Sequence, residues 1–216
     1  MPLKPLTALK ARKSPRQARS EATVDAIFEA TIQVLISQGV QRMTTTRVAE
    51  RAGVSVGTMY QYFPHKEALL YAVIERYLGE VANAVEACCQ ENVGQSIALA
   101  SDALVSAYIS AKSKHAEASR ALYLASAELA VADLVNSVFD RFQDSTTRLL
   151  SSVPDARFQD IDGVAFTLLA SLTGATRVVF ENSPTPETIE KFRQRMMAMC
   201  RAFLQDASDK PSTEAQ

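Results

Sequence analysis

The chain has 216 residues, of which 47% are apolar, and its formal net charge is −1. This length accommodates one large or two small domains with a hydrophobic core. No run reaches about 18 apolar residues, and no apolar region follows the basic first residues, which excludes a membrane span and a signal peptide and favours a cytoplasmic protein.

Composition and charge distribution indicate an all-α protein whose N-terminal region binds nucleic acid. The chain has only 7 Gly and 8 Pro, and the frequent turn signals that separate the strands of β proteins are missing. Residues 1–70 hold ten Lys or Arg and five Asp or Glu, a net charge of +5, whereas residues 71–216 hold thirteen and nineteen, a net charge of −6. A charge of only +5 per subunit favours DNA binding as a dimer.

Residues 1–19 are predicted to be a disordered basic arm. They contain six Lys or Arg, three prolines and no acidic residue. Such an arm is either an ordinary solvated tail or a source of phosphate and minor-groove contacts, as basic arms are in some DNA-binding proteins. Both interpretations stay open.

The stretch 44–70 has the pattern of two short helices joined by a tight turn. Ala49 lets the helices approach, Gly53 accepts the left-handed conformation of an abrupt turn, and Met59 locks the second short helix against the first. An amphipathic helix over residues 20–38 precedes them. We therefore predict a helix-turn-helix domain of three helices, which we place at residues 20–66.

The second short helix presents small residues first, followed by hydroxyls and amides. There is no acidic residue between Arg51 and His65. Such a surface suits insertion into a major groove, which is about 12 Å wide. A surface helical hairpin that binds nothing has the same spacing, so spacing alone leaves the two interpretations roughly even.

This region resembles the DNA-binding region of the TetR family of transcriptional regulators. The matching segments are VDAIFEATIQVLISQG at 24–39, TTTRVAERAGVS at 44–55, GTMYQYF at 57–63 and KEALL at 66–70. The resemblance covers about residues 20–78. It implies an all-α homodimer that binds a near-palindromic double-stranded DNA operator, as a repressor that an unidentified small-molecule effector releases.

The resemblance also implies which positions contact DNA. The implied contacts are Thr45 and Thr46 to the DNA backbone, Val56, Gly57, Thr58 and Gln61 with the nearby Arg47 to the bases, and Tyr60, Tyr62 and Lys66 to the phosphates. Because Val56 and Gly57 offer no side-chain hydrogen bond, part of the base reading should rest on methyl contacts.

Residues 67–206 are predicted to be a helical ligand-binding and dimerisation domain, and residues 207–216 a disordered tail. A helix over residues 66–88 is expected to connect the two domains, and in the resembled family this helix transmits ligand binding to the spacing of the DNA-binding heads. Aromatic and aliphatic residues over 95–150 are candidate ligand contacts, although ordinary core packing explains any single one of them better. These candidates are Leu104, Tyr108, Leu122, Tyr123, Phe139 and Phe142.

The last two predicted helices, over residues 158–181 and 187–204, each carry a stripe suited to helix packing. The first stripe consists of small residues at steps of four and three, and the second of large apolar residues. Both stripes suit an ordinary core, but the resemblance favours a homodimer seam in which two helices of each subunit form a four-helix bundle. The seam candidates are Gly163, Thr167, Ala170, Gly174, Val178, Phe192, Met196, Met199 and Phe203.

Catalytic and metal-binding patterns are not apparent, so we expect neither enzyme activity nor a cofactor. The two histidines, His65 and His115, have no Cys or His at metal-ligand spacing. The three cysteines, Cys88, Cys89 and Cys200, are interpreted as helix-filling residues, with a thiol-based redox regulator as the alternative. A transcriptional activator would share every feature of a repressor. The sequence names neither the effector nor the operator.

Overall fold

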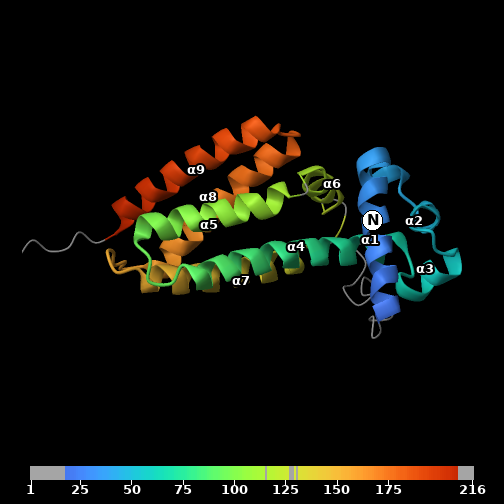
Figure 1. The fold of residues 1–216 in the computed structure, drawn as a ribbon, viewed down its shortest axis with the longest axis horizontal. Coiled ribbons are helices and arrows are strands. Elements are labelled where there is room, and N and C mark those ends of the chain that lie inside the picture. Colours follow the sequence, from blue (N-terminus) through green and yellow to red (C-terminus); the bar gives the residue numbers. More distant parts are fainter. Residues whose placement is uncertain (1–17, 115, 127–128, 130, 209–216) are drawn as a thin grey trace, which may run out of the picture. The chain divides into compact units, whose positions relative to one another are not determined.

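The computed structural model describes residues 18–114, 116–126, 129 and 131–208. Over these residues the chain forms nine α-helices and no β-strand, which confirms the all-α prediction (Figure 1). The predicted basic arm, apart from its last two residues, and most of the predicted tail lie outside the described ranges.

The chain divides into two compact units. The N-terminal unit comprises Met1–Leu78 and Ala116–Val135, as far as these are described. The C-terminal unit comprises Gly79–His115 and Asn136–Gln216, with the same restriction.

Helix α1, Ala18–Arg42, is the long support of the N-terminal unit. Its inner face is buried, with Ile27 fully enclosed and Leu35 almost so. Gly39 interrupts the helix with φ 75° and ψ 169°, a conformation that favours glycine. The predicted stop at Gly39 is thus the point at which the helical backbone breaks.

Helices α2, Thr45–Ala52, and α3, Val56–Tyr62, form the predicted helix-turn-helix. Gly53 ends α2 in the left-handed conformation, with φ 67°, and its N–H donates to the carbonyls of α2. Ala49 and Met59 are both 0% exposed, so the small residue and the apolar lock lie in the core between the helices, as predicted.

Helix α4, Lys66–Glu91, begins immediately after α3, and its first turns belong to the N-terminal unit. His65 caps it, because the Nδ1 atom of His65 accepts a hydrogen bond from the Ala68 N–H at 3.1 Å. Leu69 and Leu70 are buried and anchor these turns in the unit.

Helix α6, Ala116–Ser126, packs against α1 within the N-terminal unit. Its buried face is rich in small residues, among them Ala118 and Ala125, which permit a close approach between helices. The side-chain hydroxyls of Ser119 and Tyr77 are hydrogen bonded and join α6 to α4. The sequence pattern places this segment in the ligand-binding domain and gives no sign of its contact with α1.

The C-terminal unit contains helices α5, Ile97–Ser113, α7, Ala132–Ser152 from its residue 136 onward, α8, Ile161–Glu181, and α9, Pro186–Ala207, together with the later turns of α4. Helix α9 packs against both α5 and α8. The guanidinium of Arg193 donates to the carbonyl of Ser106 at 2.9 Å, and Arg201 pairs with Asp102 at 2.5 Å. These contacts fasten α9 along α5.

Helix α8 differs from expectation in its apolar character. By length and composition alone it is apolar enough to cross a membrane, and it is the one such helix in the described part of the chain. The expectation of no such segment came from counting unbroken apolar residues, whereas α8 reaches this character with Thr, Ser and Gly among its apolar residues. Of the most apolar 18-residue part of α8, 33% is buried within the chain, so much of this part lies at the surface.

Candidate DNA-binding surface and regulatory unit

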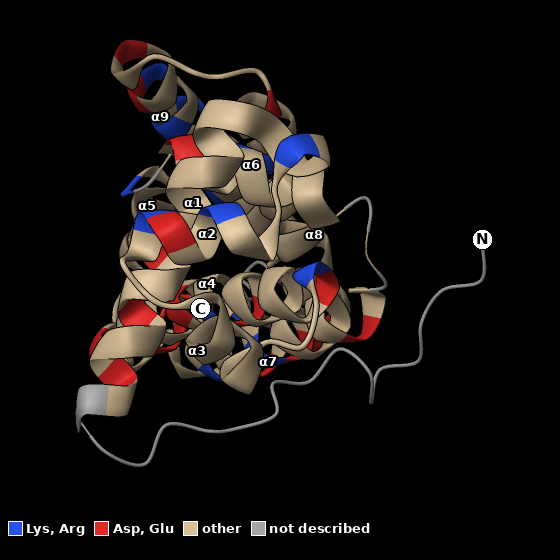
Figure 2. Ribbon diagram, turned by 90° about the vertical axis from the view of Figure 1, so that its right-hand side faces the viewer, with Lys and Arg blue, Asp and Glu red and all other residues tan. Residues whose placement is uncertain are grey.

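Helix α3 presents a neutral surface to solvent. Val56 is 39% exposed and Tyr60 is 44% exposed, while Gly57 and Gln61 are also exposed. No residue of α3 is charged, as Figure 2 shows by its uniform tan colour. Methyl, hydroxyl and amide groups can read base edges in a major groove, the methyl groups against the thymine methyl and the hydroxyls and amides by hydrogen bonds.

The start of α3 is fixed by Ser55, whose hydroxyl oxygen accepts from the Thr58 N–H at 2.9 Å. The hydroxyls of Ser55 and Thr58 also lie 2.8 Å apart. Thr58 is therefore tied to the cap through both its backbone and its side chain, and its methyl group is the part left for an outside contact. This arrangement holds the first turn of a seven-residue helix in place.

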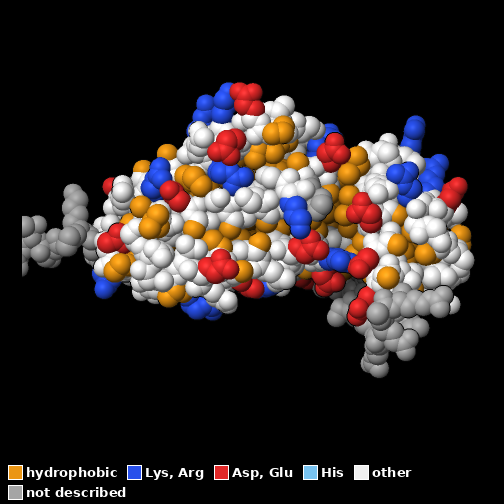
Figure 3. All heavy atoms as spheres, viewed as in Figure 1, with side chains coloured by type: hydrophobic (Ala, Val, Ile, Leu, Met, Phe, Trp, Pro, Cys, Tyr) orange, Lys and Arg blue, Asp and Glu red, His pale blue; other side chains and the backbone are white. Residues whose placement is uncertain are grey.

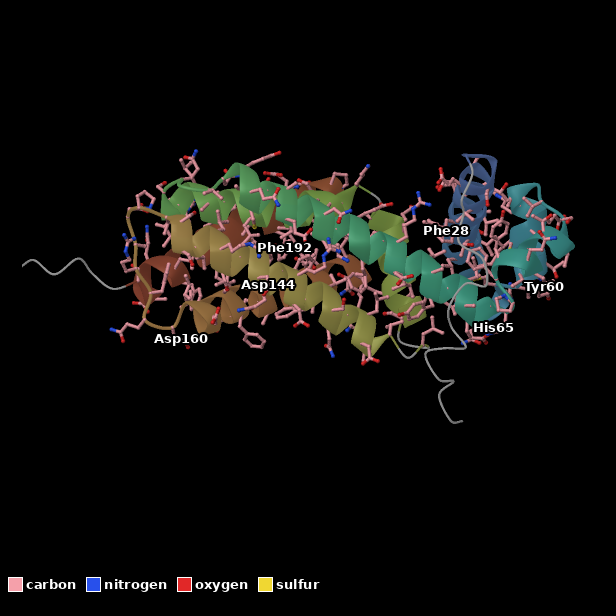
Figure 4. The ribbon with its side chains drawn as sticks, turned by 90° about the horizontal axis from the view of Figure 1, so that it is seen from below. Phe28, Tyr60, His65, Asp144, Asp160 and Phe192 are labelled. Atoms are coloured by element: carbon pink, nitrogen blue, oxygen red, sulfur yellow. The ribbon has the colours of Figure 1, made fainter. Side chains whose placement is uncertain are left out.

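Tyr60 and Thr45 form a second fixed point on the surface. Figure 4 shows Tyr60 at the outer side of α3. The hydroxyl of Thr45 donates to the Tyr60 phenol oxygen at 3.3 Å, and Thr45 itself is only 8% exposed. Thr45 thus positions the Tyr60 ring, whereas its neighbour Thr46 is exposed and accessible to DNA.

Tyr62 and Lys66, both implied phosphate contacts, also make contacts inside the N-terminal unit. Tyr62 is 7% exposed and its hydroxyl lies 2.8 Å from the Ser20 hydroxyl, which joins α3 to the first turns of α1. The Lys66 ammonium donates to the Val40 carbonyl. An ammonium has three donors, so Lys66 keeps hydrogen-bonding capacity for a phosphate.

Three arginines lie on α2 or just before it, and the sequence had indicated one of them, Arg47, as a site residue. Arg47 donates to the Gln38 side chain at 3.0 Å and to the Arg42 carbonyl at 2.6 Å. Arg51, which sequence reasoning missed as a site residue, donates to the Gln33 side chain at 2.7 Å. Arg42, Arg47 and Arg51 are all exposed, so they provide positive charge beside the neutral face of α3.

The predicted ligand contacts are divided between the two units. Leu122 and Tyr123 belong to α6 in the N-terminal unit, because the buried face of α6 packs against α1. The other four lie in the C-terminal unit. The rings of Tyr108 and Phe142 meet edge to face with centroids 5.8 Å apart. Phe139 meets Phe166, a residue that sequence reasoning missed, at 5.6 Å.

The predicted seam of α8 lies at the surface of the chain. Thr167, Ala170, Gly174 and Val178 are exposed, and Gly163 is partly exposed. In α9, Met199 is exposed, while Phe192 and Phe203 are half-buried. Met196 is different, because it is 4% exposed and buried within its own chain. Figure 3 shows hydrophobic side chains reaching the surface of the C-terminal unit.

The cysteines lie in surroundings that disfavour thiolate chemistry. Burial raises the pKa of Cys89 to about 12 and that of Cys200 to about 11, and it also raises the pKa of Cys88. Reactive and redox-sensing cysteines have lowered pKa values instead. Among the described residues no group of three or more His, Cys, Asp or Glu side chains could hold a metal ion.

Comparison with known proteins covers both halves of the chain. Residues 27–73 match the sequence profile of bacterial regulatory proteins of the tetR family, and residues 96–204 match that of the tetracyclin repressor-like C-terminal domain. A nucleoid occlusion factor, SlmA of Haemophilus ducreyi, is 43% identical over 65 residues, 30% of this chain and 32% of that protein. The transcriptional repressor KstR of Mycolicibacterium smegmatis is 42% identical over 50 residues, 23% of this chain and 24% of that protein.

The matches thus span at most about a third of the length of these curated relatives. A solved structure extends the likeness to the whole fold. A putative TetR-family transcriptional regulator from Mesorhizobium loti has a TM-score of 0.70 and 19% identity, covering 89% of this chain and all of its own. With a helix-turn-helix of the expected geometry and profile matches in both halves, the chain belongs to the TetR family of DNA-binding transcriptional regulators.

Proposed function

We propose that the protein is a homodimeric repressor that binds a near-palindromic operator and leaves it when a small-molecule effector binds the C-terminal unit. The observation that carries the proposal is the surface of α3, which is exposed, neutral and held rigidly by caps at its start. The family match supports DNA binding, and the name of the KstR relative describes a repressor. A regulator of this kind acts in the cytoplasm.

The proposed role of each side chain in DNA binding follows from its exposure. Gln61 and the methyl groups of Val56 and Thr58 contact base edges in the major groove. Tyr60, Thr46 and Lys66 contact phosphates and fix the register, while Tyr62 chiefly holds α3 in place.

The proposed dimer pairs the exposed stripes of α8 and α9. Val178 is 63% exposed and Phe166 is 55% exposed, which is unusual for large apolar side chains on one helix. The small residues between them let a second copy approach closely, and a twofold seam presents the same stripe from both subunits. Two α3 helices related in this way would enter successive major grooves about 34–36 Å apart.

The proposed effector site lies in the C-terminal unit, where the rings of Tyr108 in α5 and Phe142 in α7 meet. An effector that prefers the dimer conformation in which the two α3 helices are spaced wrongly for the operator shifts the protein toward that conformation. DNA binding is then weakened by the difference between the effector's affinities for the two conformations.

The test is selection from a random pool of duplex oligonucleotides by the purified full chain. We expect a near-palindromic sequence to be enriched, and Gln61→Ala to shift the selected bases while leaving affinity for random DNA largely unchanged. The matched control is Gln90→Ala, an exposed residue of α4 in the C-terminal unit, which should alter neither. Equal losses on operator and random DNA for Gln61→Ala would argue against a base contact.

A further inference from the structure

The turn that joins α1 to α2 begins where the helical backbone of α1 breaks. Gly39 has φ 75° and ψ 169°, and α2 starts at Thr45. Carbonyl groups near such a break, and near the end of a helix, lose the amide partner that a continuous helix would supply. The groups that satisfy these carbonyls therefore decide how firmly α2 is held against α1.

Arg47 of α2 spans the break. Its Nη1 atom donates to the Gln38 side chain at 3.0 Å, just before Gly39, and to the Arg42 carbonyl at 2.6 Å, just after it. The donor is charged, so each bond is stronger than a bond between two neutral groups. A single guanidinium thus ties the two sides of the break to each other and to α2.

The same turn receives a second cation from α4. The Lys66 ammonium donates to the Val40 carbonyl, which also accepts from the Met43 N–H at 3.3 Å. Met43 is 1% exposed, so the turn is closed by a backbone bond and anchored by a buried side chain. Side chains of α2 and of α4 therefore both hold this turn.

Arg47 lies on the side of α2 away from α3. The face toward α3 is marked by Thr45, whose hydroxyl donates to the Tyr60 phenol oxygen. Arg47 is two residues further along, which at 3.6 residues per turn is roughly 200° around the helix axis. Its guanidinium accordingly bonds α1. A base contact made alongside α3 would require Arg47 to leave both of its acceptors.

Arg51 provides the comparison. It lies four residues after Arg47 on the same face of α2, and both side chains are exposed. The Nε atom of Arg51 donates to the Gln33 side chain at 2.7 Å, well before the break at Gly39. The two arginines thus carry the same charge on the same helix face, and each bonds a glutamine of α1, but Arg47 also bonds the turn.

We infer that Arg47 is a positioning residue for DNA binding and not the base contact that the family resemblance implies. It holds the α1–α2 turn closed, and through the turn it fixes α2 and α3 for insertion into the groove. Without Arg47 the two helices take up more orientations, and ordering them is a cost that every DNA sequence must meet. The loss therefore falls on affinity and leaves the choice of bases unchanged. The inference rests on the proposed reading of the operator by α3.

The first test compares Arg47→Met with Arg51→Met in the full-length protein, on the operator selected by the unaltered protein and on a random duplex. We expect Arg47→Met to weaken binding to both duplexes by about fivefold to thirtyfold, and Arg51→Met by less than about threefold. The bases selected from a random pool should be the same for both variants. Their salt slopes should agree within about 0.3, whereas loss of a direct phosphate contact lowers the slope by about 0.9.

The second test measures amide hydrogen exchange without DNA. The Met43 N–H, which donates to the Val40 carbonyl, should exchange about fivefold to tenfold faster in Arg47→Met and at the unaltered rate in Arg51→Met. The Leu35 amide, in the unbroken part of α1, should exchange at the same rate in both variants. A general rise in exchange, at Leu35 as well as at Met43, would mean that Arg47 only stabilises the fold and would overturn the inference.

The inference is also overturned if Arg47→Met changes the selected bases, lowers the salt slope by about one relative to Arg51→Met, weakens binding no more than Arg51→Met, or leaves Met43 exchange unchanged. Gln38→Ala keeps the charge of Arg47 and removes one of its acceptors. It should show both effects to a smaller degree, and it decides the question if Arg47→Met does not fold; neither effect in Gln38→Ala would contradict the inference. A failure of the proposed function is distinguishable, because the unaltered protein would then select no operator.

Discussion

Met59→Ala tests whether the buried Met59 side chain helps to hold α3 in place. Met59 of α3 is 0% exposed, and Ala49 of the adjoining α2 is equally buried. Truncating a fully buried methionine to alanine costs about 2–5 kcal/mol, through lost burial and the cavity that remains. A whole domain is stable by only about 5–15 kcal/mol, so this loss is large for a unit built on short helices.

The assay is urea unfolding followed by circular dichroism, with DNA binding measured in parallel. Val56→Ala is the matched control, because Val56 lies in the same helix but is 39% exposed. We expect Val56→Ala to change stability by less than about 0.5 kcal/mol while it weakens operator binding. We expect Met59→Ala to reduce both. A Met59→Ala protein as stable as the Val56→Ala protein would refute the reasoning that Met59 holds α3.

Two further predictions follow from particular contacts. Lys66→Ala should weaken binding to all DNA sequences and lower the salt slope of the binding constant by roughly one, measured by titration at several salt concentrations; a change in base preference alone would contradict the phosphate role. Glu86→Gln should flatten the acid side of the stability profile. The hydrogen bond from Arg141 lowers the pKa of Glu86, so the pair's contribution is present above the ordinary glutamate pKa and is lost as pH falls through the lowered value; an unchanged profile would contradict this.

The helix-turn-helix was predictable because its determinants are local. A capping hydroxyl, a small residue, a glycine and an apolar lock lie within a few turns of one another, and each acts on its own helix or the next. Gly53 and Met59 therefore take the predicted conformation and burial. The helices of the C-terminal unit were also visible as long amphipathic runs between prolines and capping residues.

The placement of α6 was not predictable from pattern, because it depends on a distant contact. The run around Leu122 and Tyr123 reads as one more apolar helix of a regulatory core, yet its small buried residues pack against α1. The burial of Met196 was not predictable for a similar reason, since the apolar stripe on α9 is wide enough to face both its own core and the surface. The burial of Lys112 could not be seen in sequence, where a lysine near a helix end normally reaches solvent.

The most direct test of the account is sedimentation of the purified chain with a duplex carrying the selected operator, compared with a duplex carrying only one half-site. The account predicts two subunits on each full operator, with half-sites centred about 34–36 Å apart, and much weaker binding to the single half-site. One subunit per duplex, or equal binding to full operator and half-site, would contradict the claim that paired α3 helices read the DNA.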